Sequence, residues 1–189
     1  MNKLKSFFSV LLFAAVFTFG ANAQSMDNTV KVGGEAMYPM KNIVENAVKS
    51  KAHTTLVAAV QAAGLVETLK TAGPFTVFAP TNDAFENLPA GTVETLLKSE
   101  NKATLSKVLT YHVIAGKYDF KELAKLIKKG DGKASLKTVS GGMLSFSMNG
   151  DKNIMIWDEN GGGANISVYD VYQSNGVIHV IDSVVLPKM

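Results

Sequence analysis

The segment from Gly73 to Phe85 constrains the fold more than any other part of the sequence, because its structural preference changes partway along. Residues Phe75 to Phe78 are aromatic or β-branched, which suits a pleated and packed strand. Pro80 cannot donate to a β-ladder and should end that strand. A residue among 81–83 can then cap a helix that begins near Ala84. A buried strand that leads into a capped helix fixes two layers of a fold at once.

The N-terminus has the pattern of a secretory signal peptide. Lys3 and Lys5 precede an apolar run over residues 7–19, and an Ala-x-Ala site ends at Ala23. The run has about 13 residues, fewer than the roughly 20 needed to span a bilayer, so we expect cleavage rather than a membrane anchor. The signal is of bacterial type. Residues 1–23 are therefore expected to be removed during export to the periplasm or the extracellular space.

Composition excludes several classes of function. Two of the 19 basic residues, Lys3 and Lys5, leave with the signal while all 16 acidic residues remain, so the mature chain has a net charge of about +1. No basic patch indicates a nucleic-acid partner, and no second apolar run indicates a membrane span. The chain has no cysteine, which excludes disulfides, thiol catalysis and cysteine-bound zinc. The oligomeric state cannot be read from these features.

The rest of the sequence predicts one α+β domain. Residues 24–37 are polar, contain glycine and have no period, which predicts a flexible lead-in before a domain over 38–189. Periodicity, caps and glycine stops predict helices near 42–48, 54–63, 92–97, 102–110 and 119–128. Apolar alternation predicts strands near 134–139, 143–148, 153–157, 166–172 and 177–185, the last two joined by a hairpin at Asn175-Gly176. Helices, one strand, more helices and then antiparallel strands make an α+β order and not a βαβ repeat.

Three motifs give the sequence a resemblance to a known family. They are Phe75–Phe85, the Tyr-His segment Tyr111–Lys117, and Ile166–Leu186, which contains the Asn-Gly hairpin. In this order and spacing they resemble the fasciclin-like (FAS1) domain, a module of extracellular and cell-surface proteins, over roughly Met40 to Pro187. The resemblance implies a wedge of mainly antiparallel β-strands flanked by helices. It also implies a non-enzymatic role in cell adhesion or in envelope and matrix interactions, with a protein or a polysaccharide as partner.

The resemblance also points to a candidate partner-binding site. In some animal members the Tyr-His segment and its apolar neighbours contribute to integrin binding, which carried over to this sequence gives Tyr111, His112, Val113 and Ile114. A structural interpretation competes with this one and is the one we favour. In it, His112 is a core histidine that donates to a backbone carbonyl, and Tyr111 is packed inside with its hydroxyl satisfied.

No catalytic or metal-binding pattern stands above background, and no cofactor is implied. The three histidines, His53, His112 and His179, have no spacing that places a ligand pair on one helix turn. The Gly-x-Ser-x-Gly elbow of serine hydrolases is absent from the sequence. The sequence therefore predicts neither a catalytic site nor a metal site.

An alternative function is a carrier of a small hydrophobic ligand, such as a lipid or a pigment, in the cell envelope. It is suggested by apolar side chains concentrated in the C-terminal strands, namely Met143, Phe146, Met148, Met155 and Trp157. Most of these side chains are expected in the core. Any that face outward would form an apolar patch suited to a partner or a ligand.

Overall fold

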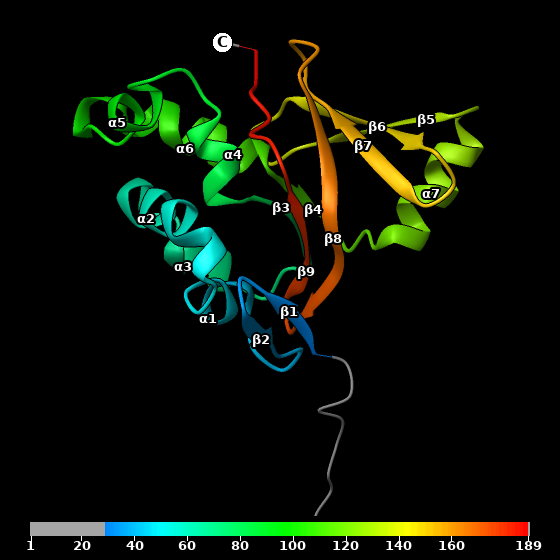
Figure 1. Ribbon diagram of the computed structural model, residues 1–189, viewed down its shortest axis with the longest axis horizontal. Coiled ribbons are helices and arrows are strands. Elements are labelled where there is room, and N and C mark those ends of the chain that lie inside the picture. The colour runs from blue at the N-terminus through cyan, green and yellow to red at the C-terminus, as the bar shows by residue number, and fades with distance from the viewer. Residues whose placement is uncertain (1–28, 189) are drawn as a thin grey trace, which may run out of the picture.

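A seven-stranded sheet lies at the centre of the computed structural model, which describes residues 29–188 (Figure 1). Its strands are β3 (Phe75–Pro80), β4 (Val113–Ala115), β5 (Lys133–Lys137), β6 (Met143–Asn149), β7 (Asn153–Trp157), β8 (Gly163–Gln173) and β9 (Gly176–Ile181). Their order across the sheet is β4-β3-β9-β8-β7-β6-β5. Every neighbouring pair is antiparallel except β3 and β9, which run parallel with Phe78 opposite His179. The mainly antiparallel sheet predicted from the sequence is confirmed.

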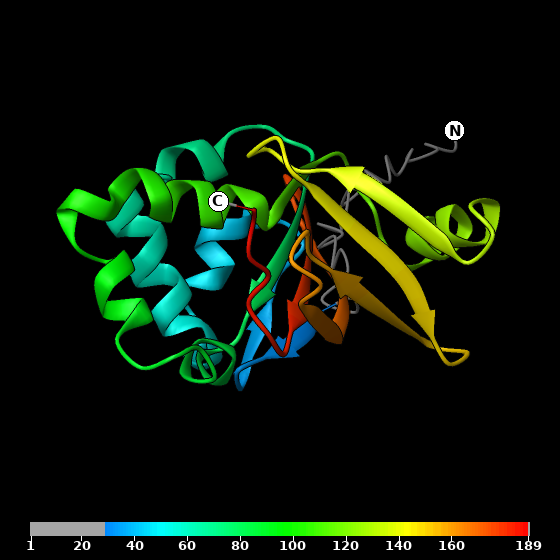
Figure 2. The same cartoon turned by 90° about the horizontal axis from the view of Figure 1, so that it is seen from above.

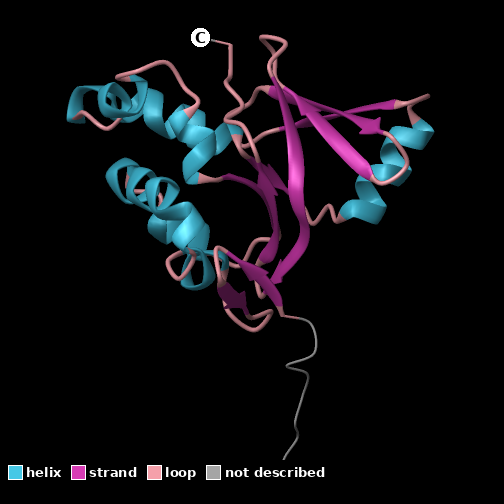
Figure 3. Ribbon diagram, in the orientation of Figure 1, coloured by secondary structure: helices cyan, strands magenta, loops and turns pink. Residues whose placement is uncertain are grey.

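Helices flank the sheet on two sides. They are α1 (Ile43–Ala47), α2 (Thr54–Ala63), α3 (Val66–Lys70), α4 (Asn82–Glu86), α5 (Thr92–Leu96), α6 (Lys102–Tyr111) and α7 (Phe120–Lys129). The first six lie together beside β3 and β9, whereas α7 lies apart from them beside β5 and β6 (Figures 1 and 3). Seen from above, the strands separate these two helical parts (Figure 2). The sheet is thus a wedge between a large helical layer and a single helix.

The helix boundaries follow the capping residues in the sequence. Asn42 Oδ1 accepts from the Glu45 N–H at 2.9 Å and Glu45 Oε2 accepts from the Asn42 N–H at 2.8 Å, a reciprocal capping box on α1. Thr81 caps α4 through the Ala84 N–H, and Asp119 caps α7 through the Glu122 N–H. The predicted transition from strand to capped helix after Phe78 is therefore confirmed, with the strand extending to Pro80.

The prediction of a flexible lead-in over 24–37 is wrong for its second half. Two short strands, β1 (Val30–Val32) and β2 (Glu35–Met37), form an antiparallel hairpin there. Val32 and Met37 are buried against apolar side chains of β3 and β9. Three-residue strands are too short to show an alternating pattern, and their burial arises only from contacts with distant strands. The predicted signal peptide, 1–23, lies outside the described residues.

The main core lies between α7 and the inner face of the sheet. It includes Phe78, Leu123, Phe146 and Ile156, all almost completely buried. The Phe78 ring lies 5.5 Å from the Phe146 ring and 5.6 Å from the His179 ring, measured between centroids. Smaller clusters pack β1 and β2 on β3 and β9, and α2 on α6. Side chains from segments far apart in the sequence, including β1 and β2, therefore pack against β3 and β9.

Candidate binding site

Tyr111 ends α6 with its side chain completely buried. Its hydroxyl donates to the Met143 carbonyl at 2.7 Å and accepts from the Glu159 N–H at 3.1 Å. Burial raises the pKa of Tyr111 to about 12, because the charged phenolate would lose its hydration. The hydroxyl thus joins the end of α6 to the first residue of β6 and to the turn that follows β7.

His112 lies at the C-terminal cap of α6 and is 3% exposed. Its Nε2 accepts from the Val185 N–H at 3.2 Å, so the ring hydrogen is on Nδ1, which donates to the Val108 carbonyl at 2.8 Å. Desolvation by burial lowers the pKa of His112 to about 4, so the ring is neutral at pH 7. His112 therefore connects α6 to the segment that follows β9, which is the structural role favoured from the sequence.

The two apolar neighbours of this pair are buried as well. Val113 is 6% exposed and Ile114 is 2% exposed, and the two side chains belong to different core clusters on either side of the sheet. The four residues indicated by the family resemblance therefore do not form an exposed surface. His112 and Val113 instead line the wall of a groove described below.

The other two histidines are also engaged in structural contacts. His179 is fully buried in β9, where Nε2 donates to the Tyr118 carbonyl at 2.8 Å and Nδ1 accepts from the Asp170 N–H at 3.4 Å. His53 is buried with Nδ1 2.8 Å from Ser50 Oγ. Desolvation lowers the pKa of both histidines. Residues 29–188 contain no group of three histidine, aspartate or glutamate side chains placed to hold a metal ion.

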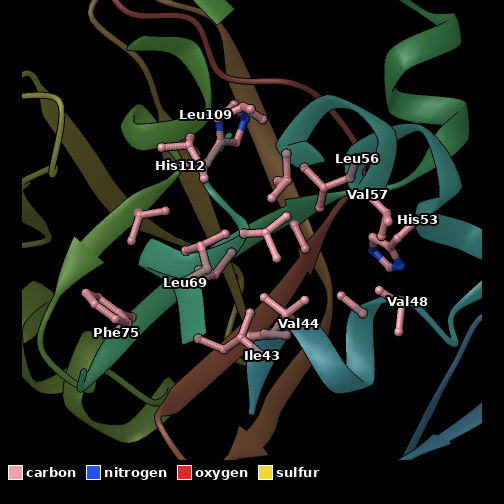
Figure 4. A pocket seen from close by; sticks show the side chains of 18 of the residues that line it. Ile43, Val44, Val48, His53, Leu56, Val57, Leu69, Phe75, Leu109 and His112 are labelled. Atoms are coloured by element: carbon pink, nitrogen blue, oxygen red, sulfur yellow. The ribbon is translucent and has the colours of Figure 1, made fainter. Parts of the chain in front are cut away.

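An apolar groove of about 250 Å³ lies between the helical layer and the sheet (Figure 4). Aliphatic side chains from three helices form one wall, namely Val44, Val48, Leu56, Val57, Val60 and Leu69. Phe75 and Val77 of β3, Ile178 of β9 and the buried Val113 lie on the opposite wall. The groove is open to solvent, since the lining side chains Val48 and Val139 are 48% and 47% exposed. Clefts lined mainly by apolar side chains are the usual binding sites for small molecules.

Asn175 fixes the helices that border this groove. Its Nδ2 donates to the carbonyls of Leu69 at 2.8 Å and Thr71 at 2.9 Å, and its Oδ1 accepts from the Ile43 N–H at 3.0 Å. One side chain in the β8–β9 turn therefore binds both the start of α1 and the end of α3. Sequence reasoning predicted the turn from Asn175-Gly176 but missed this role, because nothing local to the turn indicates it.

The aromatic and methionine set of the C-terminal strands does not gather in one pocket. Phe146 is in the core, whereas Met143 and Met148 are 40% and 36% exposed. Met155 and Trp157 are half-buried. The apolar groove is built mainly from helical aliphatic residues that no sequence pattern groups together. These residues come from segments that become neighbours only in the folded chain.

Comparison with known proteins identifies the family. Residues 51–187 match the family model described as the fasciclin domain. The chain belongs to the fasciclin domain family. It is 44% identical over 169 residues to protein sll1483 of Synechocystis sp., a match covering 89% of this chain and 86% of that protein. It is also 35% identical over 150 residues to the transforming growth factor-beta-induced protein ig-h3 of Sus scrofa, covering 79% of this chain but 20% of that longer protein.

The fold of this fasciclin domain matches a solved structure. The match is to a FAS1 domain pair from the insect cell adhesion molecule fasciclin I, with a TM-score of 0.69 and 20% sequence identity, over 78% of this chain and 51% of the other. At that identity the match shows the fold alone. Within residues 29–188, no helix has the length and apolar character needed to cross a bilayer.

Proposed function

We propose that this fasciclin domain is an exported, non-enzymatic binding module that acts in adhesion or in contacts between the cell envelope and its surroundings. The observation that carries the proposal is a contrast within the described residues. Side chains that often serve catalysis, including Tyr111, His112 and His179, are used in buried hydrogen bonds, whereas an apolar groove is open to solvent. The signal-like residues 1–23 support export. Membership of the fasciclin domain family, whose domains occur in cell adhesion proteins, supports the adhesive role.

The adhesive role is tested by a binding screen with the mature chain, residues 24–189. The chain would be immobilised and exposed to envelope proteins of its own host, to matrix polysaccharides and to soluble mature chain. We expect saturable binding to at least one of these three classes. Absence of saturable binding to all three would overturn the proposal.

A second candidate function, a carrier of a small lipid or pigment, is favoured by the groove itself. Burying apolar ligand surface there contributes about 25 cal/mol per Å² removed from water. The groove volume of about 250 Å³ is slightly below the roughly 300–1,000 Å³ of small-molecule sites, so the groove fits one apolar chain or ring system better than a large ligand. Its open side leaves room for the remainder of a ligand to extend into solvent.

The carrier function is tested by native mass spectrometry of protein purified from its own host. We expect a bound species with the mass of a lipid or a pigment. Protein that is purified without a ligand and that also fails to bind a fluorescent fatty acid would overturn the carrier function. Val57→Asp would place a carboxylate on the wall of the groove, at a half-buried residue outside the core clusters. We expect at least about tenfold weaker probe binding, which is roughly 1.4 kcal/mol. Val93→Asp on α5, half-buried outside the groove, is the matched control.

A further inference from the structure

The C-terminal part of the sheet has a face that no core cluster covers. Alternate side chains of β6 and β7, such as Phe146 and Ile156, point into the main core. The remaining positions point the other way and are exposed or half-buried. We call this surface the outer sheet face and define it as the odd-numbered residues of β5, β6 and β7, together with Gly163 and Asn165 of β8. It shares no residue with the apolar groove.

Trp157 is the last residue of β7 on the outer sheet face, between Ser145 of β6 and Gly163 of β8, and it is held on both sides. Its Nε1–H donates to Ser147 Oγ on β6 at 3.0 Å. On the β8 side its ring rests against Gly163, where an added Cβ would be 3.2 Å from Trp157 Cζ3. The absence of a side chain at Gly163 therefore makes room for the ring to span from β6 to β8. The half-buried indole is a rigid aromatic surface that remains open to solvent.

Hydroxyl and amide groups lie on the same face of the sheet as this indole. Ser135 Oγ and Ser145 Oγ lie 3.0 Å apart across β5 and β6, and Asn149 Nδ2 donates to Asn165 Oδ1 at 3.0 Å. Such groups can both donate and accept hydrogen bonds. The strands hold them in regular rows, at the roughly 4.8 Å strand spacing of a sheet. The face thus combines one aromatic ring and two methionines, Met143 and Met155, with an ordered set of neutral polar groups.

The charge of the outer sheet face is positive. Lys133 and Lys137 are exposed on β5, and β5, β6 and β7 contain no aspartate or glutamate. Two carboxylates that border the face, Asp182 and Glu159, accept hydrogen bonds from backbone groups. Asp182 accepts from the Asn165 N–H at 2.8 Å, and Glu159 accepts from the Met143 N–H at 2.9 Å. An anionic partner that covers this face would therefore meet two lysines on β5, two strands away from the aromatic ring on β7.

We propose that the outer sheet face binds an acidic polysaccharide. A pyranose ring has an apolar C–H face, which suits the half-buried indole of Trp157, and a rim of hydroxyls, which suits the serine and asparagine side chains. Carboxylates on neighbouring sugars complement Lys133 and Lys137, which also steer the approach of an anionic chain. This inference rests on the proposed binding role and names the partner for that role. The proposed binding surface is separate from the apolar groove.

The single tryptophan of the chain reports directly on this face. Mature protein would be titrated with polygalacturonate and, separately, with neutral dextran, at low salt and at 0.5 M NaCl. We expect a saturable shift of the tryptophan emission with polygalacturonate at low salt, weakened at high salt because exposed charges are screened. No shift with polygalacturonate, or an equal shift with dextran, would overturn the proposal.

Variants separate recognition by this face from general attraction of charge. Trp157→Ala should weaken binding by about tenfold, the size typical of a central aromatic contact, as measured by retardation in native gels containing polygalacturonate. The pair Lys133→Gln and Lys137→Gln should weaken it similarly. The control pair, Lys128→Gln and Lys129→Gln on α7, makes the same change in net charge at exposed positions and should retain binding. Equal loss in both lysine pairs would refute a specific site.

The same samples would be tested for fatty-acid probe binding, which reports on the groove alone. In the variants of the outer sheet face, weakened polygalacturonate binding with normal probe binding is the expected result. In the wild type, absence of polygalacturonate binding with normal probe binding would count against the outer sheet face and leave the groove unaffected. The reverse result would count against the carrier function and leave the polysaccharide site standing.

Discussion

The neutral, buried state of His112 predicts that acid destabilises this protein. The unfolded chain binds a proton at His112 near pH 6.5, whereas the folded chain does so only near pH 4. Stability from this group is complete above pH 6.5 and is lost as the pH falls through the window between the two values. For these pKa values, the free energy of unfolding should fall by about 2 kcal/mol between pH 7.5 and pH 5 from His112 alone.

Urea unfolding at 25 °C across this pH range measures the effect. His53 and His179 also have lowered pKa values and act in the same direction, so the wild type should lose more than the His112 contribution. The His112→Gln variant isolates the contribution of His112 to the pH dependence, because the glutamine amide can donate and accept hydrogen bonds but does not titrate. The variant should be less stable at pH 7.5 yet lose about 2 kcal/mol less than the wild type on acidification.

Equal pH dependence in the wild type and in His112→Gln would refute this reasoning. A direct NMR titration of the imidazole gives an independent check. A His112 pKa near 6.5 would mean that the ring is hydrated in solution and free to meet a partner, contrary to its burial and its two hydrogen bonds.

Two further substitutions test the other buried polar contacts. Tyr111→Phe removes a hydroxyl bonded to two backbone groups and should lower the free energy of unfolding by about 1–2 kcal/mol, measured by urea unfolding; an unchanged midpoint would contradict the role of the hydroxyl. Asn175→Ala leaves the carbonyls of Leu69 and Thr71 and the Ile43 N–H without their partner, and should cost about 3 kcal/mol or more. Ser174→Ala, at the exposed neighbouring position, is its control and should change stability by less than about 0.5 kcal/mol.

The sequence predicted the local elements of this fold well, because their signals are local. The caps at Asn42, Thr81 and Asp119 and the hairpin before Gly176 all depend on residues a few positions apart. The parallel pairing of β3 with β9 was missed, since no local pattern encodes which distant strand is the neighbour.

The candidate site was predicted less well, for a related reason. The family resemblance identified Tyr111 and His112 as important residues, and the structure gives both of them buried hydrogen bonds. Motif identity alone does not distinguish a residue that contacts a partner from one that supports the fold. The apolar groove could not be predicted, because its walls come from helices and strands that meet only in the tertiary structure.

The parallel pairing of β3 with β9 has a consequence for how the chain acquires its structure. The β9 strand ends at Ile181, close to the C-terminus, yet it lies between β3 and β8 and joins the early and late parts of the sheet. The sheet therefore cannot close until nearly the whole chain is free to fold. In a chain exported N-terminus first, as we propose, this sheet stays open until β9 has crossed the membrane. The order of strands would then keep the protein competent for translocation and delay folding until it reaches its destination.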